Sequence, residues 1–409
     1  MHIRNDVVVS KNKRSKSRPW TVRWWGKYDI IIEKQPRHSK SFSTKKKAEK
    51  YAQSLKDDIY DGISVEPMNI TVAKLWEKYL NIEKNKLEPS SLSNYRQTAG
   101  RLINYFGSHR NIKSINKEQA EEFLADIKLL DGKGPSDSTR ARHLRNAKLI
   151  FNKAVEWEYI RKNPFKGIKL GKPETEDWRF ITPDEFKCLI NAIDSIPIRI
   201  KVEKLGYERK TMLKAFYSIM YGCGLRFGEA ANLMWDNGNI DFINSKINLS
   251  NRNSSKELPP FKLKNHQART IHAPNWVMGP LKNLKEISSP NSPFVFLNPT
   301  RLGYVKAKWQ ELKEQGREDK WLNSMMILNT HRKFHLYCQK AGIITNDRLS
   351  VHCLRKSYGT NLADAGTPVH TLKDMMGHSD IKTTMSFYIK STDANKQKAV
   401  EALERMMGA

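Results

Sequence analysis

Two breaks in the hydrophobic pattern divide this chain of 409 residues, and the division limits the folds open to it. Residues 62–69 and 166–177 lack the periodicity of helices and strands, and the second stretch is rich in charged residues. A chain of this length accommodates two or three domains. We therefore expect a multidomain, mainly α-helical protein. Its expected parts are residues 1–64, 70–166, 178–395 and a tail at 396–409.

The first segment combines short strands with one helix. Residues 18–34 alternate apolar and polar side chains around a Gly-Lys pair, which predicts two strands and a turn, and Phe42 belongs to a third strand. A Ser-Thr pair then caps a helix over residues 45–60. Residues 1–60 carry 16 Lys or Arg against 6 Asp or Glu. This small, basic sheet-plus-helix module either binds in a DNA groove or is a scaffold whose Trp residues only form a core.

Four helical patterns follow in the second segment. Asn116 and Gln119 form one of the helix starts, with the spacing of a capping box. The last of the four, from about Ser138 to Trp157, carries a basic flank beside its apolar stripe. The residues of that flank are Arg140, Arg142, His143, Arg145 and Lys148. We expect a compact bundle whose basic flank grips DNA or, alternatively, faces solvent.

The third segment opens with a strong helix start, in which Thr182 is the N-cap and a proline takes the first helical position. Helical patterns dominate from there to the end of the chain. Residues 240–274 are the exception, because apolar residues alternate around Asn244 and a further strand follows at 269–271. We expect a mixed, mainly α domain with a small β-hairpin sheet.

The charge of the chain points to a polyanionic partner. It carries 72 Lys and Arg against 43 Asp and Glu, a formal net charge of +29. Double-stranded DNA is the expected partner, and a basic solvated surface is the alternative. No apolar run approaches the roughly 20 residues that span a bilayer, and the N-terminus lacks a secretory signal. The cysteines are scattered, so we expect reduced thiols, a cytoplasmic protein and no membrane partner.

Four motifs in the C-terminal half supply the groups for phosphoryl transfer. They are Tyr221-Gly-Cys-Gly-Leu-Arg226-Phe-Gly-Glu229, His352-Cys-Leu-Arg355, Met376-Gly-His378-Ser379 and Tyr388. Two guanidiniums, Arg226 before a predicted helix and Arg355 on another, can clamp the non-bridging oxygens of a phosphodiester. Tyr388 is the candidate nucleophile, activated by nearby positive charge. No carboxylates are spaced to hold magnesium, so we expect no metal and no cofactor.

These motifs resemble those of the tyrosine recombinases of the phage integrase family, over about residues 180–395. The resemblance implies that Arg226 and Arg355 hold the scissile phosphate and that Tyr388 forms a 3′-phosphotyrosyl link. It further implies that His352 accepts or donates a proton and that His378 donates a hydrogen bond to the phosphate.

The family also has a lysine that acts as general acid for the departing 5′ oxygen. Lys264 resembles it, with Lys262 and Lys256 as nearby alternatives. Glu229 resembles a supporting acidic residue that helps to position Arg226.

Two stretches depart from the family pattern. The strand region contains a polar segment at 251–255, and a charged helical stretch from Val305 to His335 exceeds what a minimal catalytic domain needs. In the tail, Val400, Leu403 and Met406 share one face of a predicted helix. The resemblance implies that this face packs on a neighbouring protomer, and packing on its own domain is the alternative.

The leading hypothesis is a site-specific DNA recombinase that integrates or excises a phage or mobile element. The extra basic N-terminal module favours an integrase over a minimal resolving recombinase. The family implies a homotetramer on DNA, with a directionality factor or a host architectural protein as further partners, at the nucleoid of a bacterial host. The alternatives are a catalytically inactive architectural DNA-binding protein of the same fold and a relaxing topoisomerase that shares the chemistry.

Overall fold

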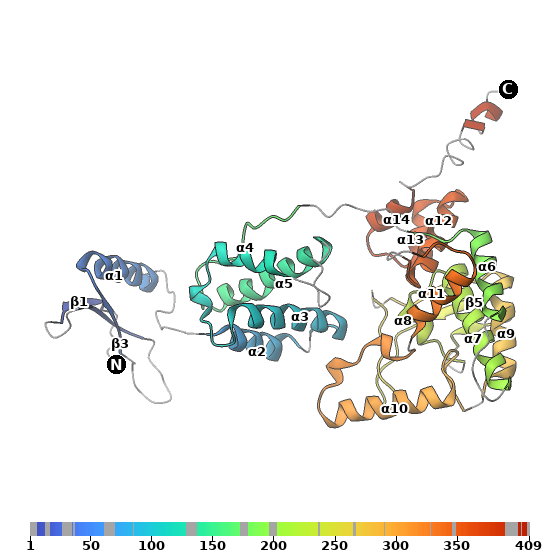
Figure 1. Ribbon diagram of the computed structural model, residues 1–409, viewed down its shortest axis with the longest axis horizontal. Coiled ribbons are helices and arrows are strands. Elements are labelled where there is room, and N and C mark those ends of the chain that lie inside the picture. The colour runs from blue at the N-terminus through green and yellow to red at the C-terminus, as the bar shows by residue number, and fades with distance from the viewer. Residues whose placement is uncertain are drawn as a thin grey trace. The chain divides into compact units, whose positions relative to one another are not determined.

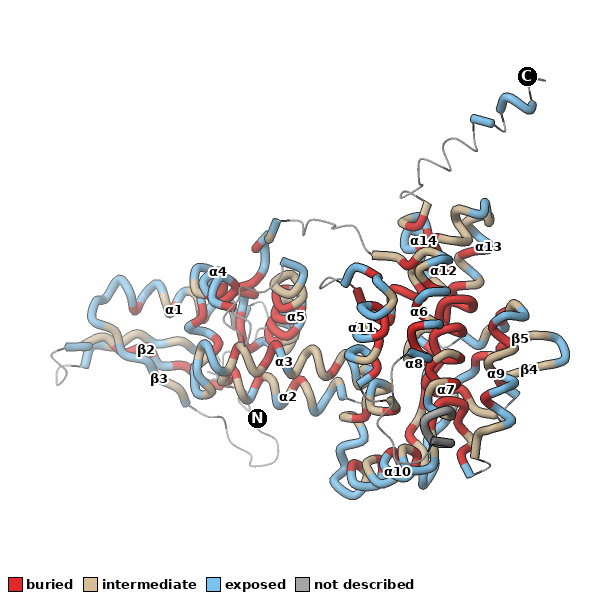
Figure 2. The backbone as a smooth tube through the Cα atoms, turned by 45° about the vertical axis from the view of Figure 1, so that its right-hand side comes forward, coloured by how far each residue is buried: buried red, intermediate tan, exposed pale blue. Residues whose placement is uncertain are grey.

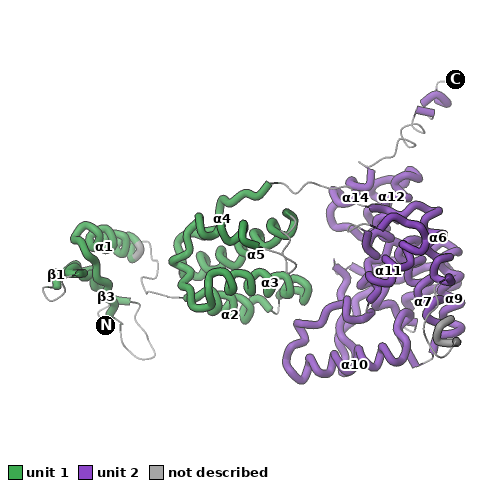
Figure 3. The backbone as a smooth tube through the Cα atoms, viewed as in Figure 1, with its two compact units in different colours: residues 1–174 green, residues 175–409 purple. Residues whose placement is uncertain are grey.

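A computed structural model describes most of the chain. The described residues are 6–12, 17–26, 35, 37–60, 70–84, 86–127, 137–171, 179–195, 203–235, 238–264, 267–289, 291–327, 329–345, 349–388, 400–401 and 403–406. They belong to two compact units, Met1–Glu174 and Thr175–Ala409 (Figure 3). The division falls in the connector expected at residues 166–177. Within the described ranges, no helix has both the length and the apolar character to cross a membrane.

The first unit begins with a three-stranded antiparallel sheet in the order β1-β2-β3, with one helix packed on it (Figure 1). Val22 and Trp24 of the central strand are buried together with Ala48, Ala52 and Leu55 of the helix. The elements are β1 (Val8–Lys11), β2 (Trp20–Trp25), β3 (Arg37–Phe42) and α1 (Lys45–Tyr60).

The sequence predicted β2, the strand at Phe42 and α1 correctly, but it missed β1. That strand has four residues, none of them buried, so it shows no alternation between a core face and a solvent face. The strand expected around Ile30–Ile32 lies outside the described residues.

A helical bundle completes the first unit. Its core contains Phe123, Phe151 and Phe165, which are almost fully buried. The predicted capping box is present, because Asn116 accepts from the Gln119 N–H (2.8 Å) and Gln119 accepts from the Asn116 N–H (3.3 Å). The elements are α2 (Val72–Glu83), α3 (Pro89–Phe106), η1 (Ile112–Ser114), α4 (Lys117–Asp126) and α5 (Asp137–Glu156).

His143 does not belong to the basic flank on which the sequence placed it. The side chain is 1% exposed, and its Nδ1 lies 2.9 Å from Thr98 Oγ1 inside the bundle. The reason is helical spacing, since residues 143, 147, 150 and 154 fall on one face of α5, and that face is buried.

The second unit is mainly helical and contains a small antiparallel sheet in the order β4-β5-β6, in which Ile247 lies opposite Ile271. Both the mainly α class and the expected hairpin sheet are confirmed. The elements are α6 (Pro183–Ser195), α7 (Glu203–Gly222), α8 (Phe227–Ala231), β4 (Ile240–Asp241), β5 (Lys246–Leu249), β6 (Arg269–His272), α9 (Asn275–Ile287), α10 (Pro299–Glu314), η2 (Glu318–Lys320), η3 (Asn323–Met325), α11 (Thr330–Lys340), α12 (His352–Asp364), α13 (Val369–Met376) and α14 (Ile381–Tyr388).

The core of the second unit is built around α7, which is largely buried (Figure 2) and packs on α9 and α12. A separate apolar cluster lies under α10 and includes Trp309 and Trp321. In the tail, the described residues are helical as predicted. Val400, Leu403 and Met406 are exposed there.

Candidate active site

A tight turn before α8 places Arg226 at the start of that helix. Gly224 has a φ of +63°, and a Cβ there would come within 2.3 Å of the Tyr358 ring, so only glycine fits. Arg226 is the N-cap of α8, and its backbone N–H donates to Glu229 Oε2 (2.8 Å). The Arg226 guanidinium donates to the other carboxylate oxygen, Oε1, at 2.9 Å. The predicted position of Arg226 at a helix N-terminus is thus confirmed.

Glu229 is the centre of a cluster of three arginines. Arg269 donates to both of its carboxylate oxygens, at 3.0 and 2.8 Å, and Arg355 Nη1 lies 3.8 Å from Oε2. Glu229 is 3% exposed, and burial alone would raise its pKa, but Arg269, Arg355 and Arg226 lower it. Because one carboxylate faces three guanidiniums, two positive charges in this cluster have no internal counter-charge.

Arg355 lies on α12 and is held by the backbone. It is 2% exposed, and its guanidinium donates to the carbonyls of Gly224 and Met376. Burial and then the charge of Arg226 lower the pKa of Arg355 to about 9. The side chain therefore keeps its positive charge at neutral pH.

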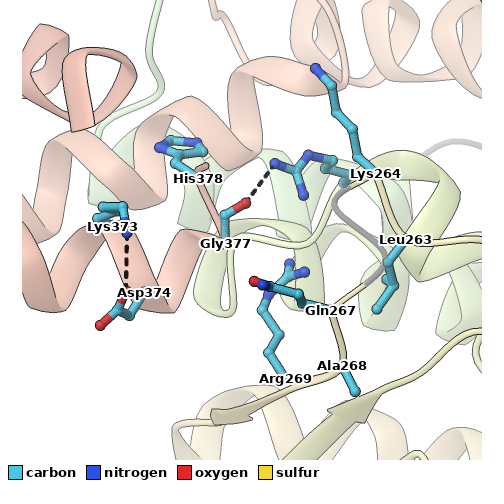
Figure 4. A pocket seen from close by; sticks show the side chains of 10 residues that line it. Leu263, Lys264, Gln267, Ala268, Arg269, Lys373, Asp374, Gly377 and His378 are labelled. Carbon is cyan, nitrogen blue, oxygen red and sulfur yellow. Dashed lines mark hydrogen bonds and ion pairs between the residues drawn. The ribbon is translucent and has the colours of Figure 1, made fainter. Parts of the chain in front are cut away.

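A cavity of about 220 Å³ lies beside this cluster (Figure 4). Its lining residues come from the N-cap of α8, the segment before β6, β6 itself, the end of α13 and the turn that follows it: Arg226, Leu263, Lys264, Gln267, Ala268, Arg269, Lys373, Asp374, Gly377 and His378. Arg226 also donates to the Gly377 carbonyl at 3.1 Å. Three of the predicted residues, Arg226, Lys264 and His378, are thus brought to one cavity.

Lys264 lines this cavity, whereas the alternatives Lys262 and Lys256 do not. The Lys264 side chain is exposed, and in Figure 4 it extends away from Gln267 and Arg269. An exposed ammonium at the end of a flexible lysine side chain can approach a bound anion at the cavity mouth.

His378 follows the left-handed Gly377 at the end of α13. Its Nδ1 lies 3.0 Å from Thr384 Oγ1, and its ring stacks on Phe387 at 6.1 Å between centroids. Partial burial and then the charges of Arg355 and other cations lower the pKa of His378 to about 4. The imidazole is therefore neutral at pH 7.

His352 is the first residue of α12, and its side chain is partly exposed to solvent and partly covered by neighbouring protein atoms. Desolvation by the surrounding protein atoms and then the positive charges of Arg355, Lys356 and Arg226 lower its pKa. A neutral imidazole at this position can accept a proton.

The structure does not bring the Tyr388 hydroxyl into the cavity. Tyr388 is the last residue of α14, and its hydroxyl donates to the backbone carbonyl of Thr367, between α12 and α13. Burial raises the pKa of the phenol, so this arrangement does not activate it. The neighbouring Phe387 stacks on His378, which places the end of α14 next to a cavity-lining residue.

Sequence reasoning missed Arg269, although it predicted the strand that contains it. In β6, Thr270 and His272 are exposed and Ile271 is buried, so Arg269 shares the inward face with Ile271. An arginine on the buried face of a strand requires an acidic partner, so the alternation along this strand could have identified Arg269 as part of a buried ion pair. Among the described residues, no three His, Cys, Asp or Glu side chains come together to hold a metal ion.

Two family models match the chain. The phage integrase family matches residues 179–395, and the phage integrase SAM-like domain matches residues 71–171. The first of these spans the candidate site, and the second spans the helical bundle.

Individual proteins are similar over most of the chain. A tyrosine recombinase XerC-like protein of Caldanaerobacter subterraneus subsp. tengcongensis is 25% identical, covering 88% of this chain and 89% of that protein. The ICEBs1 integrase of Bacillus subtilis is 23% identical, covering 91% and 92%. Among solved structures, the Tn1549 transposon integrase in complex with a circular intermediate DNA has a TM-score of 0.60 at 21% identity, covering 82% of this chain and 99% of that chain. That structure shows the fold that the two chains share.

Proposed function

Because this chain belongs to the phage integrase family, we propose that it is a site-specific DNA recombinase that cleaves and rejoins DNA through a covalent link to Tyr388. The observation that supports this most is the cavity beside the Glu229 cluster. There, three arginines share one buried carboxylate, and Lys264 and His378 line the same space. The uncompensated positive charge suits a phosphodiester anion, and preorganised cations stabilise the charge that develops on its oxygens.

In the proposed reaction, Tyr388 Oη attacks the phosphorus atom and the bond from phosphorus to the 5′ oxygen breaks. The phenol proton passes to the neutral imidazole of His352, and the ammonium of Lys264 gives a proton to the departing 5′ oxygen. Arg226 and Arg355 hold the non-bridging oxygens throughout, which requires that DNA binding makes the buried Arg355 guanidinium accessible to the phosphate. The phosphotyrosyl link keeps a phosphoester bond, so attack by a 5′-hydroxyl can reverse the step without ATP.

His378 fits the role of a hydrogen-bond donor. If the Thr384 hydroxyl donates to Nδ1, the neutral ring carries its proton on Nε2. Such a ring donates to the phosphate without adding a further charge to the arginine cluster.

The Tyr388 hydroxyl has to leave Thr367 before it can attack. Among the described residues, the hydroxyl makes one hydrogen bond, to a backbone carbonyl, and the ring packs on the apolar cluster that contains Leu372 and Met376. Such a bond contributes roughly 0.5–1.5 kcal/mol net, which is small beside the free energy of binding many phosphates. We propose that DNA binding releases the tyrosine.

We further propose that residues 1–64 bind arm-type sites, that 70–166 grip the core site and that 178–395 form the catalytic domain. Lys11 and Lys45 lie over the ring of Trp20, and Lys40 lies over Tyr51, so the first module displays cations on aromatic faces. A homotetramer on two duplexes, a directionality or host architectural partner and a cytoplasmic location belong to the same proposal. The names of the similar ICEBs1 and Tn1549 integrases favour a mobile element as the substrate.

The test is covalent trapping on a nicked suicide substrate that carries the recombination site, in the presence of EDTA. The wild-type chain should form an adduct that survives SDS, and Tyr388→Phe should form none while it still binds the DNA. Tyr358→Phe is the matched control, since Tyr358 is buried and its hydroxyl has no hydrogen-bond partner among the described residues.

Trapping by Tyr388→Phe at the wild-type level would refute the nucleophile, and loss of trapping in EDTA would indicate a metal nuclease instead. A wild-type chain that binds but never forms an adduct would be the architectural protein. Cleavage without a defined footprint would indicate a relaxing topoisomerase.

A further inference from the structure

Residues 252–261 form a loop that is closed at its base immediately before Lys264. Arg252 and Phe261 exchange two backbone hydrogen bonds, both at 2.8 Å, in an isolated antiparallel bridge. A further hydrogen bond holds the base of the loop closed, in which the Leu263 N–H donates to Asn251 Oδ1 at 2.8 Å. Leu263 is 2% exposed in the core, and Lys264 follows it into the cavity lining. The position of Lys264 therefore depends on how firmly the base of this loop is held.

The Arg252 side chain ties the base of the loop to the end of α8. Its guanidinium donates to Asn232 Oδ1 (2.7 Å), to the Asn232 carbonyl (3.4 Å) and to the Pro259 carbonyl (3.3 Å). It also lies 4.9 Å from the centroid of the Phe294 ring. Asn232 is the C-cap of α8, the same short helix that carries Arg226 and Glu229. One side chain thus links the helix of the arginine cluster to the loop before the lysine.

The charged stretch from Val305 to His335 contacts the other side of this loop. Trp309 of α10 is 2% exposed, and its indole N–H donates to the Ser255 carbonyl at 3.2 Å. Leu258 packs on the same apolar cluster as Trp309. Asn323 of η3 lies 3.4 Å from the Asn232 amide and packs against Gly228. Residues 299–327 therefore contact both the loop and α8.

We infer that Arg252, Asn232 and Trp309 are positioning residues that hold Lys264 at the cavity relative to Arg226. None of the three lines the cavity, so in this proposal they act through the lysine. This inference rests on the proposed function, in which Lys264 protonates the leaving oxygen. It accounts for both departures from the family pattern, the polar segment at 251–255 and the stretch after Val305.

The test compares two leaving groups in single-turnover cleavage by the full-length protein. One suicide substrate has the normal 5′-bridging oxygen and the other has sulfur at that position. Because a thiol ionises near ~8.5, a thiolate leaves without a proton, so the sulfur substrate does not need a general acid. The readout is the ratio of the two rates, which a general loss of folded protein or of DNA affinity does not change.

Lys264→Ala should cleave the oxygen substrate slowly and the sulfur substrate at close to the wild-type rate. Arg252→Lys keeps the positive charge but loses the planar set of N–H donors of the guanidinium. It should slow cleavage of the oxygen substrate about tenfold, which is part of the rate enhancement that a general acid contributes. The rate with the sulfur substrate should stay within about twofold of the wild type. Trp309→Phe removes the bond to Ser255 and should shift the ratio in the same direction by about threefold. It provides the test if Arg252→Lys does not fold.

Arg179→Gln is the matched control, since Arg179 pairs with Glu185 and, among the described residues, none of its hydrogen bonds or ion pairs reaches residues 252–261. It should leave the ratio of rates at the wild-type value. Equal slowing of both substrates by Arg252→Lys and Trp309→Phe would overturn the inference, and so would failure of sulfur to rescue Lys264→Ala. If the wild-type chain forms no adduct with either substrate, the proposed function itself is wrong.

Discussion

Replacing Glu229 by glutamine should destabilise the second unit strongly. The substitution keeps the shape of the side chain but removes the only negative charge of the arginine cluster. It also places an amide N–H2 opposite guanidinium donors that now lie 2.8–3.0 Å from carboxylate oxygens. Breaking a buried charge pair costs roughly 3–5 kcal/mol. Since the Arg226 and Arg269 side chains are still 23% and 14% exposed, we expect the lower end, about 3 kcal/mol.

For a unit of this size that loss corresponds to a fall in Tm of about 6–12 °C. Differential scanning calorimetry of the full chain measures it, with Glu257→Gln as the matched control, because Glu257 pairs with Lys306 in solvent and should leave Tm unchanged. The pH dependence gives a second readout. The pKa of Glu229 is lowered in the folded state, so its contribution is complete above the unfolded pKa and is lost as the pH falls through the folded pKa.

Glu229→Gln should therefore show a shallower loss of stability in acid than the wild type. A Tm within about 1 °C of the wild type, with the same acid dependence, would refute the claim that this carboxylate holds the arginines together.

Two further predictions concern the first unit. Burial and then the charges of Arg101 and Arg142 lower the pKa of His143 to about 4, so the unfolded state binds a proton on this ring more readily than the folded state does. The neutral ring should therefore contribute about 3 kcal/mol to the free energy of unfolding above pH ~6.5, and this contribution should be lost as the pH falls toward 4. In urea titrations, His143→Gln should make the free energy of unfolding depend less steeply on pH over that range. Deleting residues 1–64 should abolish binding to arm-type sites but leave weak cleavage at the crossover core, with the affinity of the full chain falling steeply with salt; footprints identical before and after the deletion would contradict the assignment of an arm-binding module.

Local signals in the sequence predicted much of the fold. The capping box at Asn116, the helix start at Thr182 and the hairpin around Asn244 each depend on residues close in the chain, and the structure contains all three. The resemblance to the family implied that Arg226, Lys264 and His378 belong to one site, and all three line the cavity.

The features that the sequence could not predict depend on contacts between distant residues. Arg269 meets Glu229 across 40 positions, and Trp309 meets Ser255 across 54. The hydroxyl of Tyr388 is turned to Thr367 by the packing of α12, α13 and α14, which no local pattern encodes. The sequence assigned no role to residues 299–327 for the same reason, because their role depends on the residues that they contact in the fold.

The most direct test of the proposed mechanism identifies the residue that becomes linked to DNA. The wild-type adduct, formed in EDTA on a suicide substrate, is digested with nuclease and trypsin, and the modified peptide is sequenced by mass spectrometry. Cleavage after Lys382 and Lys390 gives a peptide with a single tyrosine, at position 388, beside the hydroxyls of Thr383, Thr384 and Ser386. The proposed mechanism predicts a nucleotide phosphate on Tyr388. A phosphate on any other residue, or no modified peptide from a cleaved substrate, would contradict it.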